Sequence, residues 1–132
     1  MTAHAGSPEE VARQVRVALE SADLASFAEL LDPDVHWGPP GDASPPCRNR
    51  EQVIAWYGRG RAAGTRASVT EVELLGDQIL VGLTVTGNET ARGRGDGVER
   101  WQLLTVRDGR VTDIVAFEQR IEAVVWASRL PG

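Results

Sequence analysis

Three side chains of this chain could move a proton near neutral pH: Glu99, Glu118 and His36. Both glutamates lie in segments where apolar and polar residues alternate, as they do in β-strands. On the first of these segments Glu99 shares a face with Trp101. On the second, Glu118 shares a face with Ile114. A carboxylate buried among such neighbours loses its hydration, which raises its pKa and suits it to proton transfer. The alternative is that each glutamate lies in water near a strand end or pairs with a neighbouring arginine.

His36 is the only histidine outside the N-terminal segment. An imidazole is suited to act as a general base or to donate a hydrogen bond to a ligand. Successive residues of a strand point to opposite faces, so only one of His36 and Trp37 can point inward. Apolarity favours Trp37, although the Gly- and Pro-rich segment that follows could turn His36 towards the mouth of a pocket.

Four aromatic side chains are candidates for the lining of a ligand cavity: Trp37, Trp56, Tyr57 and Trp101. Pockets for flat or hydrocarbon ligands are usually lined in this way. The alternative is that these residues only fill the core, because large aromatic side chains are also common there.

Several kinds of site are excluded by the residue types that the chain contains. All fourteen basic residues are arginine, which excludes Schiff-base catalysis by lysine and a phosphate-binding loop of the Walker type. Cys47 is the only cysteine, which excludes an intrachain disulfide and a cysteine-rich zinc site, and we expect a buried structural thiol. Asp32, Asp34, His36 and Asp42 match no spacing of metal ligands. We therefore expect neither a metal nor a cofactor.

Length and charge indicate one domain over residues 1–132, with 1–6 as a flexible tail. The net charge is −5, and no stretch resembles a basic stripe, so we do not expect nucleic acid as a partner. No apolar run reaches the roughly 18 residues of a membrane span. No export signal is recognisable, so the expected location is the cytoplasm.

The helices are predicted from residues that typically cap them. Ser7, Asp23 and Asn49 each precede apolar residues at helical spacing, which predicts helices over 8–21, over a short segment from 24, and over 50–63. Val15 lies on the apolar stripe of the first of these helices.

Strands are predicted by alternation of period two and by the turns between them. Gly76-Asp77 and Asp108-Gly109 are turn pairs, and they predict antiparallel hairpins. Helices followed by an antiparallel sheet indicate an α+β domain. The expected strands are a short one over 34–37 and long ones over 66–75, 78–87, 98–107 and 110–120, followed by a short helix over 121–130.

Three segments carry a resemblance to a known superfamily: VRVALESADLASFAELLDPDVHW, CRNREQVIAWY and LLTVRDGRVTDIVAFE. In their order and pattern they resemble the nuclear-transport-factor-2-like superfamily, and within it the SnoaL-like and ketosteroid-isomerase-like group. The resemblance implies a curved antiparallel sheet wrapped around helices, which forms a cone with one open end. It also implies a pocket for a small, often apolar, molecule. Members of the superfamily include isomerases, polyketide cyclases, dehydratases, epoxide hydrolases and non-catalytic binding proteins, so the fold alone does not name the function.

The chain departs from the ketosteroid-isomerase pattern at two of three functional positions. The position of that family's carboxylate base falls on Trp37 or Gly38, and the position of its helical tyrosine falls near Val15. The third functional group of that family is an acid on the strand that precedes the last strand. It is the only one of the three with a counterpart in this chain, near Glu99. Steroid isomerisation is therefore not carried over.

The resemblance implies that the faces of Glu99 and Glu118 both look into the cone. We then expect a cofactor-independent acid–base reaction on a small apolar organic molecule: isomerisation, cyclisation, dehydration or epoxide opening. Glu118 and Glu99 are the expected proton-transfer groups, with His36 at the mouth. The alternative is a non-catalytic domain of the same fold that binds a ligand or a partner. The expected lining of the pocket comprises Trp37, Trp56, Tyr57, Trp101, Ile114 and Val15.

A homodimer is expected through one face of the sheet, because that face is too apolar to be left in water. Its expected residues are Arg100, Gln102, Leu104 and Val106 beside Asp113, Val115 and Phe117.

Overall fold

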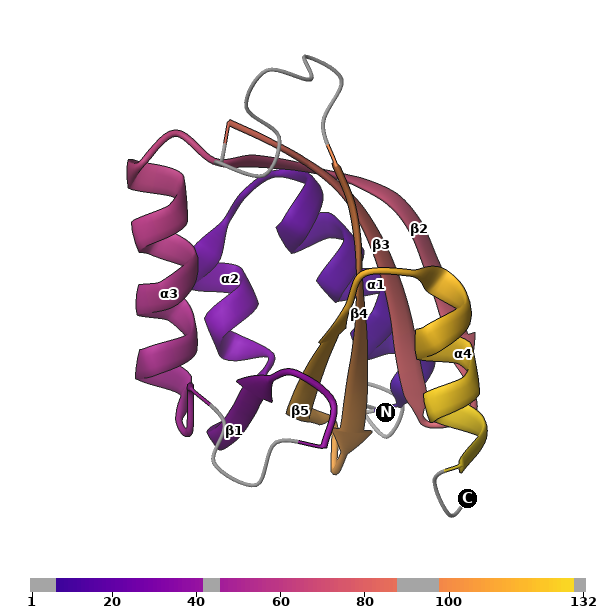
Figure 1. The fold of residues 1–132 in the computed structure, drawn as a ribbon. Helices are drawn as coiled ribbons and strands as arrows, with labels where there is room; N and C mark the ends of the chain where they lie inside the picture. The colour runs from indigo at the N-terminus through magenta and orange to yellow at the C-terminus, as the bar shows by residue number, and fades with distance from the viewer. Residues whose placement is uncertain (1–6, 42–45, 88–97, 130–132) are drawn as a thin grey trace.

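The computed structural model describes residues 7–41, 46–87 and 98–129. The expected tail over 1–6 and the connection between the second and third long strands lie outside these residues. Within the described residues, four helices and five strands form the α+β domain expected from the sequence (Figure 1). In chain order they are α1 (Pro8–Glu20), α2 (Leu24–Glu29), β1 (Leu31–Gly38), α3 (Arg50–Ala62), β2 (Arg66–Leu75), β3 (Gln78–Thr86), β4 (Val98–Arg107), β5 (Arg110–Phe117) and α4 (Arg120–Arg129).

The three helix starts predicted from the sequence are confirmed by side-chain caps. The hydroxyl of Ser7 accepts a hydrogen bond from the backbone N–H of Glu10 at 3.2 Å. The carboxylate of Asp23 caps α2 through Ser26 N–H at 3.1 Å. Asn49 Oδ1 accepts from the N–H of the third residue after it at 2.9 Å. Each cap satisfies a backbone donor that the first turn of a helix leaves without a partner.

The sheet has the strand order β1-β5-β4-β3-β2. The four long strands form the expected antiparallel meander, and β1 runs parallel to β5 at one edge. β1 is longer than predicted because it starts at Leu31. The ladder with β5 is irregular between Leu31 and His36, and Pro33, which has no N–H to donate, falls in that irregular part.

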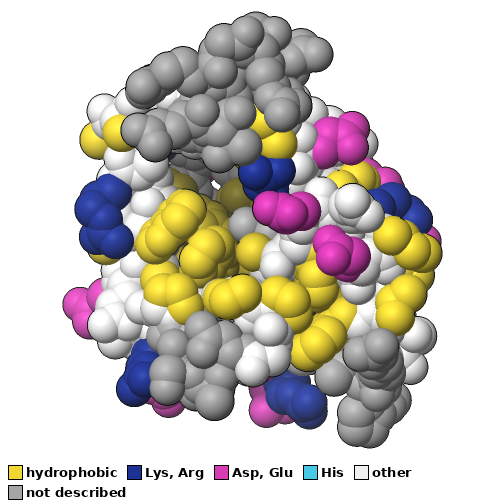
Figure 2. Space-filling model, viewed as in Figure 1, with side chains coloured by type: hydrophobic (Ala, Val, Ile, Leu, Met, Phe, Trp, Pro, Cys, Tyr) yellow, Lys and Arg dark blue, Asp and Glu magenta, His cyan; other side chains and the backbone are white. Residues whose placement is uncertain are grey.

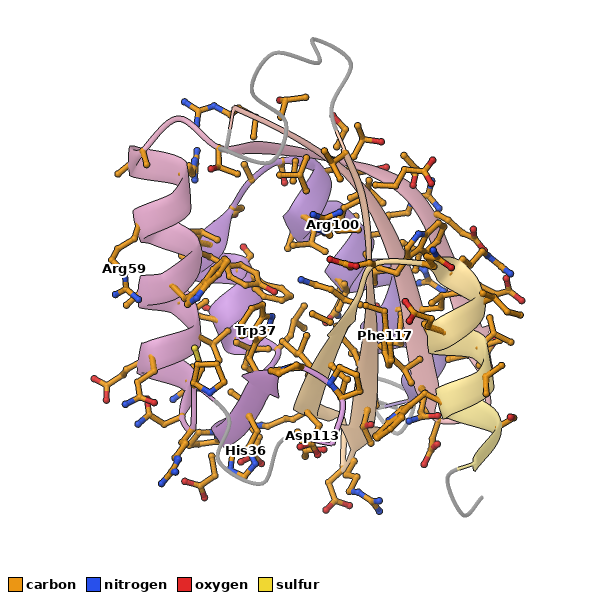
Figure 3. The ribbon with its side chains drawn as sticks, in the orientation of Figure 1. His36, Trp37, Arg59, Arg100, Asp113 and Phe117 are labelled. Carbon is orange, nitrogen blue, oxygen red and sulfur yellow. The ribbon has the colours of Figure 1, made fainter. Side chains whose placement is uncertain are left out.

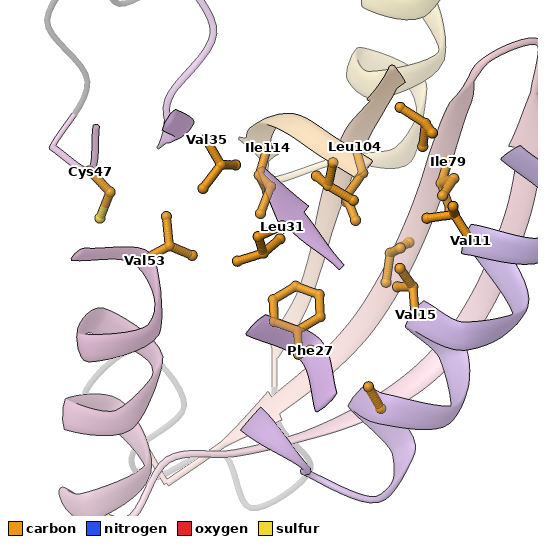
Figure 4. Close-up of a cluster of buried hydrophobic side chains, with 14 of the residues drawn as sticks. Val11, Val15, Phe27, Leu31, Val35, Cys47, Val53, Ile79, Leu104 and Ile114 are labelled. Atoms are coloured by element: carbon orange, nitrogen blue, oxygen red, sulfur yellow. The ribbon is translucent and has the colours of Figure 1, made fainter. Parts of the chain in front are cut away.

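Both faces of the sheet are covered by helices. On one face, which we call the cone, the larger cluster of buried residues joins α1, α2 and α3 to the sheet (Figure 4). On the other face, which we call the outer face, α4 covers a smaller cluster (Figure 1). The smaller cluster comprises Leu80, Trp101, Leu103, Phe117 and Ala123.

The register of β4 with β5 corrects the expected orientation of β4. Leu104 pairs with Ile114, and both belong to the cluster in the cone. Trp101 pairs with Phe117, and both lie on the outer face under α4. The prediction that the face of Glu99 and Trp101 looks into the cone is therefore wrong. Alternation alone could not distinguish the two faces, because β4 is covered on both sides and carries apolar residues on both.

The same register corrects the face that was expected to form a dimer. Gln102 and Leu104 point into the cone, whereas Val115 and Phe117 point to the outer face. The residues expected on one exposed surface therefore lie on two opposite faces.

An ion-pair cluster joins the first residue of α4 to the outer face of β2. The guanidinium of Arg120 lies 2.7 Å from Glu71 Oε2 and 2.8 Å from Glu73 Oε1. The hydrogen bond from Arg120 lowers the pKa of Glu71. Arg120 also stands over the ring of Trp101, with its Cζ 5.9 Å from the ring centroid. These contacts hold the start of α4 against the sheet.

Gly82 makes room for the indole of Trp101, which pairs with it across β3 and β4. A Cβ at Gly82 would lie 2.8 Å from Cη2 of Trp101 and 2.9 Å from Oγ1 of Thr70. Both distances are shorter than real Cβ contacts, so this position requires the absence of a side chain.

We predict that Gly82→Ala destabilises the protein by about 1–3 kcal/mol, because the added methyl group overpacks the contact with Trp101. Urea unfolding followed by circular dichroism measures the change. The matched control is Gly58→Ala in the interior of α3, where a Cβ meets no atom within 4 Å. This control should gain about 0.5–1 kcal/mol through helix propensity. Equal stability of Gly82→Ala and the parent protein would contradict the overpacking argument.

Candidate functional site

A continuous row of aromatic rings runs along the cone from the core to its edge, and we call it the aromatic wall. The ring of Phe27 stacks on Tyr57 at 5.5 Å between centroids. Tyr57 meets the edge of Trp56 at 6.2 Å, and Trp56 contacts Trp37 at 4.6 Å. Phe27 is fully buried, whereas Trp56 is 42% exposed. The wall therefore leads from the core to solvent.

Local structure explains how β1 and α3 position this wall. Trp37 and Cys47 exchange two backbone hydrogen bonds, of 3.0 and 3.3 Å, which close the Pro-rich segment between them. This bridge leads the chain directly to Asn49, the cap of α3. Val53 and Tyr57 lie four residues apart on α3, so both point to the core.

Two polar side chains meet at the inner side of the aromatic wall. The hydroxyl of Tyr57 donates a hydrogen bond to Oε1 of Gln102 at 3.3 Å, which joins α3 to β4. Burial raises the pKa of Tyr57 to about 12. The nearby indole N–H of Trp37 has the opposite effect and lowers the pKa of Tyr57. Trp37 Nε1 is itself buried and forms no hydrogen bond, so the two groups are close without hydrogen-bond geometry.

A hollow opens to solvent on the face of the molecule shown in Figure 2, and we call it the recess. Hydrophobic side chains over α3 and β1 border one side of it, and charged side chains over β4 and the start of α4 border the other (Figure 2). Figure 3 places Arg100 on that charged side and Trp37 on the hydrophobic side. Arg100 is half-buried, and its Nη1 donates to the carbonyl of Glu99 at 2.8 Å.

The structure separates the two glutamates that sequence analysis paired. Glu118 follows Phe117, the last residue of β5. The ladder of β4 with β5 ends at the pair of Trp101 and Phe117, and Glu118 lies in the exposed bend between β5 and α4. Glu99 pairs with Thr84 and points to the outer face. Both carboxylates are exposed, so neither has the desolvated surroundings that were expected.

His36 points away from the cone, and Trp37 takes the inward position as apolarity suggested. The Nδ1 of His36 lies 3.8 Å from Oδ1 of Asp113 on the neighbouring strand, and both side chains are about half exposed (Figure 3). They border an open groove of about 240 Å³ between β1, β5 and Trp126 of α4. His36 is therefore not brought together with the aromatic wall.

The remaining predicted lining residues are not open to the recess. Trp101 lies under α4 on the outer face. Val15 and Ile114 are fully buried and belong to the closed core of the cone. Of the predicted lining, the structure brings together Trp37, Trp56 and Tyr57.

Gln102 and Arg100 are the polar residues of the cone that sequence analysis did not select as site residues. Both were assigned to an outer dimer face, because the orientation of β4 was inverted. The sequence does carry a signal for Gln102, which is a polar residue between the apolar residues Trp101, Leu103 and Leu104. A polar group inside an apolar strand needs a hydrogen-bond partner, and this need marks it as a candidate site residue.

The described residues offer little support for a metal site or a reactive thiol. No group of three or more His, Cys, Asp or Glu side chains within them could hold a metal ion. Cys47 is buried, its thiol donates to the carbonyl of Gln52 at 3.7 Å, and burial raises its pKa. Within residues 7–129, apart from the undescribed stretches, no helix is long and apolar enough to cross a membrane.

We predict that Tyr57 titrates near pH 12 in the folded protein and near pH 10 after unfolding. The folded state holds the phenolic proton more tightly. Its stabilising effect is therefore complete below about pH 10 and is lost as the pH rises towards 12, by on the order of 2 kcal/mol. Tyr57 is the only tyrosine, so the ultraviolet absorbance of its phenolate reports this titration alone. A native midpoint near pH 10 would contradict the burial of the hydroxyl.

Comparisons with known proteins agree with this architecture. The model of the SnoaL-like domain family matches residues 11–114. The chain has no match among curated protein sequences.

Three solved structures illustrate the similarity of fold. A protein from Sinorhizobium meliloti assigned as a polyketide cyclase is 22% identical, with a TM-score of 0.61, over 82% of this chain and 94% of that one. One from Kribbella flavida assigned as a ketosteroid isomerase is 19% identical, with a TM-score of 0.66, over 86% and 78%. An NTF2-like protein from Cytophaga hutchinsonii is 9% identical, with a TM-score of 0.62, over 89% and 95%. At these identities the similarity shows the fold, which confirms the nuclear-transport-factor-2-like architecture expected from the sequence.

Proposed function

Because the chain belongs to the SnoaL-like domain family, we propose that it binds a small, largely apolar organic molecule in the recess and rearranges it by isomerisation or cyclisation. The proteins from S. meliloti and K. flavida, assigned as a cyclase and an isomerase, support these two reaction types.

The aromatic wall is the observation that carries this proposal. Its rings run from the buried Phe27 to the half-exposed Trp56, so a flat ligand can stack on the exposed tryptophan at the solvent end of a row that is anchored in the core. The hydrogen-bonded pair of Tyr57 and Gln102 lies at the inner side of the wall. A polar group of the ligand would be oriented there, and the apolar remainder would lie against the tryptophans.

Glu118 is the proposed proton-transfer group. It directly follows β5, and its exposed carboxylate is proposed to reach the mouth of the recess. An ionised carboxylate there can accept a proton from a carbon atom of the ligand and return it to another position. Glu99, on the outer face, has no such role in this proposal.

We predict that Glu118→Gln strongly slows proton transfer and that Glu99→Gln does not. The readout is exchange of ligand C–H for deuterium in D₂O, followed by NMR on a panel of small apolar isomerase and cyclase substrates. Glu118→Gln should lower the exchange rate by about 10²- to 10⁴-fold, the usual contribution of a general base. Glu99→Gln is the matched control, because it removes the same charge from an exposed site on the opposite face. Equal rates for the two variants would remove the assignment of Glu118.

A non-catalytic binding domain is the second candidate function, and the exposure of Glu118 favours it. In that case the panel would bind with no exchange in the parent protein.

A homodimer remains a prediction, but the sheet face no longer supports it. The large apolar side chains that are exposed on α4, Ile121 at 62% and Val125 at 42%, are the better candidates for such a contact.

A further inference from the structure

The groove at His36 and Asp113 is separate from the recess, and the proposed function does not use it. Its volume is about 240 Å³, and the residues that line it include Val115 and Trp126. Both of these pack against the cluster of the outer face, under and on α4. Trp37 and Tyr57, in contrast, pack against the cluster in the cone. A molecule in this groove would therefore not contact the inner part of the aromatic wall.

The carboxylate of Asp113 has an unused capacity to accept hydrogen bonds. Its recorded contact with a cationic or titratable side chain is the one with His36, whose Nδ1 lies 3.8 Å from Oδ1 (Figure 3). Hydrogen bonds from nitrogen to oxygen extend only to about 3.2 Å, so these two side chains share none. None of the described residues that line the groove is an arginine. The negative charge of Asp113 is therefore not paired within the groove.

The spacing of the two side chains fits a nitrogen that carries more than one hydrogen. Oδ1 of Asp113 is an acceptor, and Nδ1 of a neutral imidazole is an acceptor when its proton is on Nε2. One ligand nitrogen at about 2.9 Å from each of these atoms can donate a separate N–H to both of them. A positive charge on that nitrogen strengthens the bond to the carboxylate. A primary ammonium group meets both requirements, whereas a hydroxyl group has one hydrogen to donate and a quaternary ammonium group has none.

Apolar side chains lie beside this polar end of the groove. Val115, Pro39 and Trp126 contribute to its lining. The ring of Trp126 also packs against Phe117, at 6.2 Å between centroids, which holds the indole in place. The face of an indole attracts cations as well as apolar groups. The groove thus joins an acidic end to a wall suited to a flat hydrocarbon body.

We propose that this groove is a second binding site, whose ligand is a primary ammonium group attached to a flat, apolar body, as in an arylalkylamine. The ammonium group donates to Oδ1 of Asp113 and to Nδ1 of His36. The apolar body lies along Trp126 and Pro39. This site does not depend on the recess, so the inference stands or falls independently of the proposed function.

Three probes with the same phenylethyl body test the site: phenethylamine, phenethyl alcohol and phenethyltrimethylammonium. Each is titrated at neutral pH into the isotope-labelled full chain and followed by NMR. The four tryptophans give four indole N–H signals, and Trp126→Phe identifies the one that reports the groove. Phenethylamine should shift this signal and bind about five- to twentyfold more tightly than phenethyl alcohol, because hydrogen bonds to charged groups are the stronger ones. Phenethyltrimethylammonium, which has the charge without the N–H groups, should fall between them.

Two exposed side chains can be replaced to separate charge from hydrogen bonding. Asp113→Asn keeps the shape and removes the charge, and it should bring the affinities of phenethylamine and phenethyl alcohol within about twofold of each other. His36→Phe keeps a ring without an acceptor, and it should bind phenethylamine no more tightly than phenethyltrimethylammonium. Glu29→Gln is the matched control, because it removes the same charge from an exposed position on α2 and should behave as the parent protein.

Each contrary outcome overturns a stated part of the inference. Equal affinities of the parent protein for phenethylamine and phenethyl alcohol, or a preference for the amine that survives in Asp113→Asn, would remove the assignment of the ammonium group. An unchanged Trp126 signal would overturn the site itself, whether or not another indole signal shifts. The proposed function of the recess is tested by carbon–hydrogen exchange and is unaffected by any of these results.

Discussion

The register between β4 and β5 is the constraint on which the interior of this protein depends. Side chains of a strand alternate between two faces, so a shift by one residue would exchange the two clusters of buried residues. The pairing of Leu104 with Ile114 sets Gln102 inside the cone and Trp101 outside it. Gln102 can meet Tyr57 only in this register, although the two residues are 45 positions apart in the chain.

Helices cover both faces of the sheet, and the two faces carry different kinds of polar group. Ionic groups of the outer face serve structure, as Arg120 does when it joins α4 to Glu71 and Glu73. The cone, in contrast, contains aromatic rings and the neutral hydrogen-bonded pair of Tyr57 and Gln102, with the half-buried Arg100 on the charged side of the recess (Figure 3). Under the proposed function, a ligand would therefore meet the charge of Arg100 before the neutral groups of Tyr57 and Gln102.

The features that could be predicted from the sequence are those that depend on neighbouring residues. The caps Ser7, Asp23 and Asn49 act within three residues of themselves, and all three were recognised. The antiparallel meander followed from turns that join adjacent strands. The resemblance to a known superfamily then supplied the overall arrangement, and the structure and the family match confirmed it.

The orientation of β4 could not be predicted, because it depends on a helix that follows in the chain. α4 covers the outer face and buries Trp101 and Leu103, so this face is closed from solvent like the one that carries Leu104. Both faces of β4 then look like a core in the sequence, and the face that the resemblance implied to be inward is the outer one. The list of candidate site residues changes accordingly. Glu99 and Trp101 lie on the outer face, whereas Gln102 and Arg100 lie on the cone side of β4.

The contact between Gly82 and Trp101 also limits the order in which the sequence can change. A side chain at Gly82 meets the indole across the ladder, so it is tolerated only after Trp101 has been replaced by a smaller residue. The reverse order is open, because losing the indole leaves a cavity and no collision. Relatives that carry a larger residue at the position of Gly82 should therefore also lack tryptophan at the position of Trp101, and the two positions should covary in an alignment of the family.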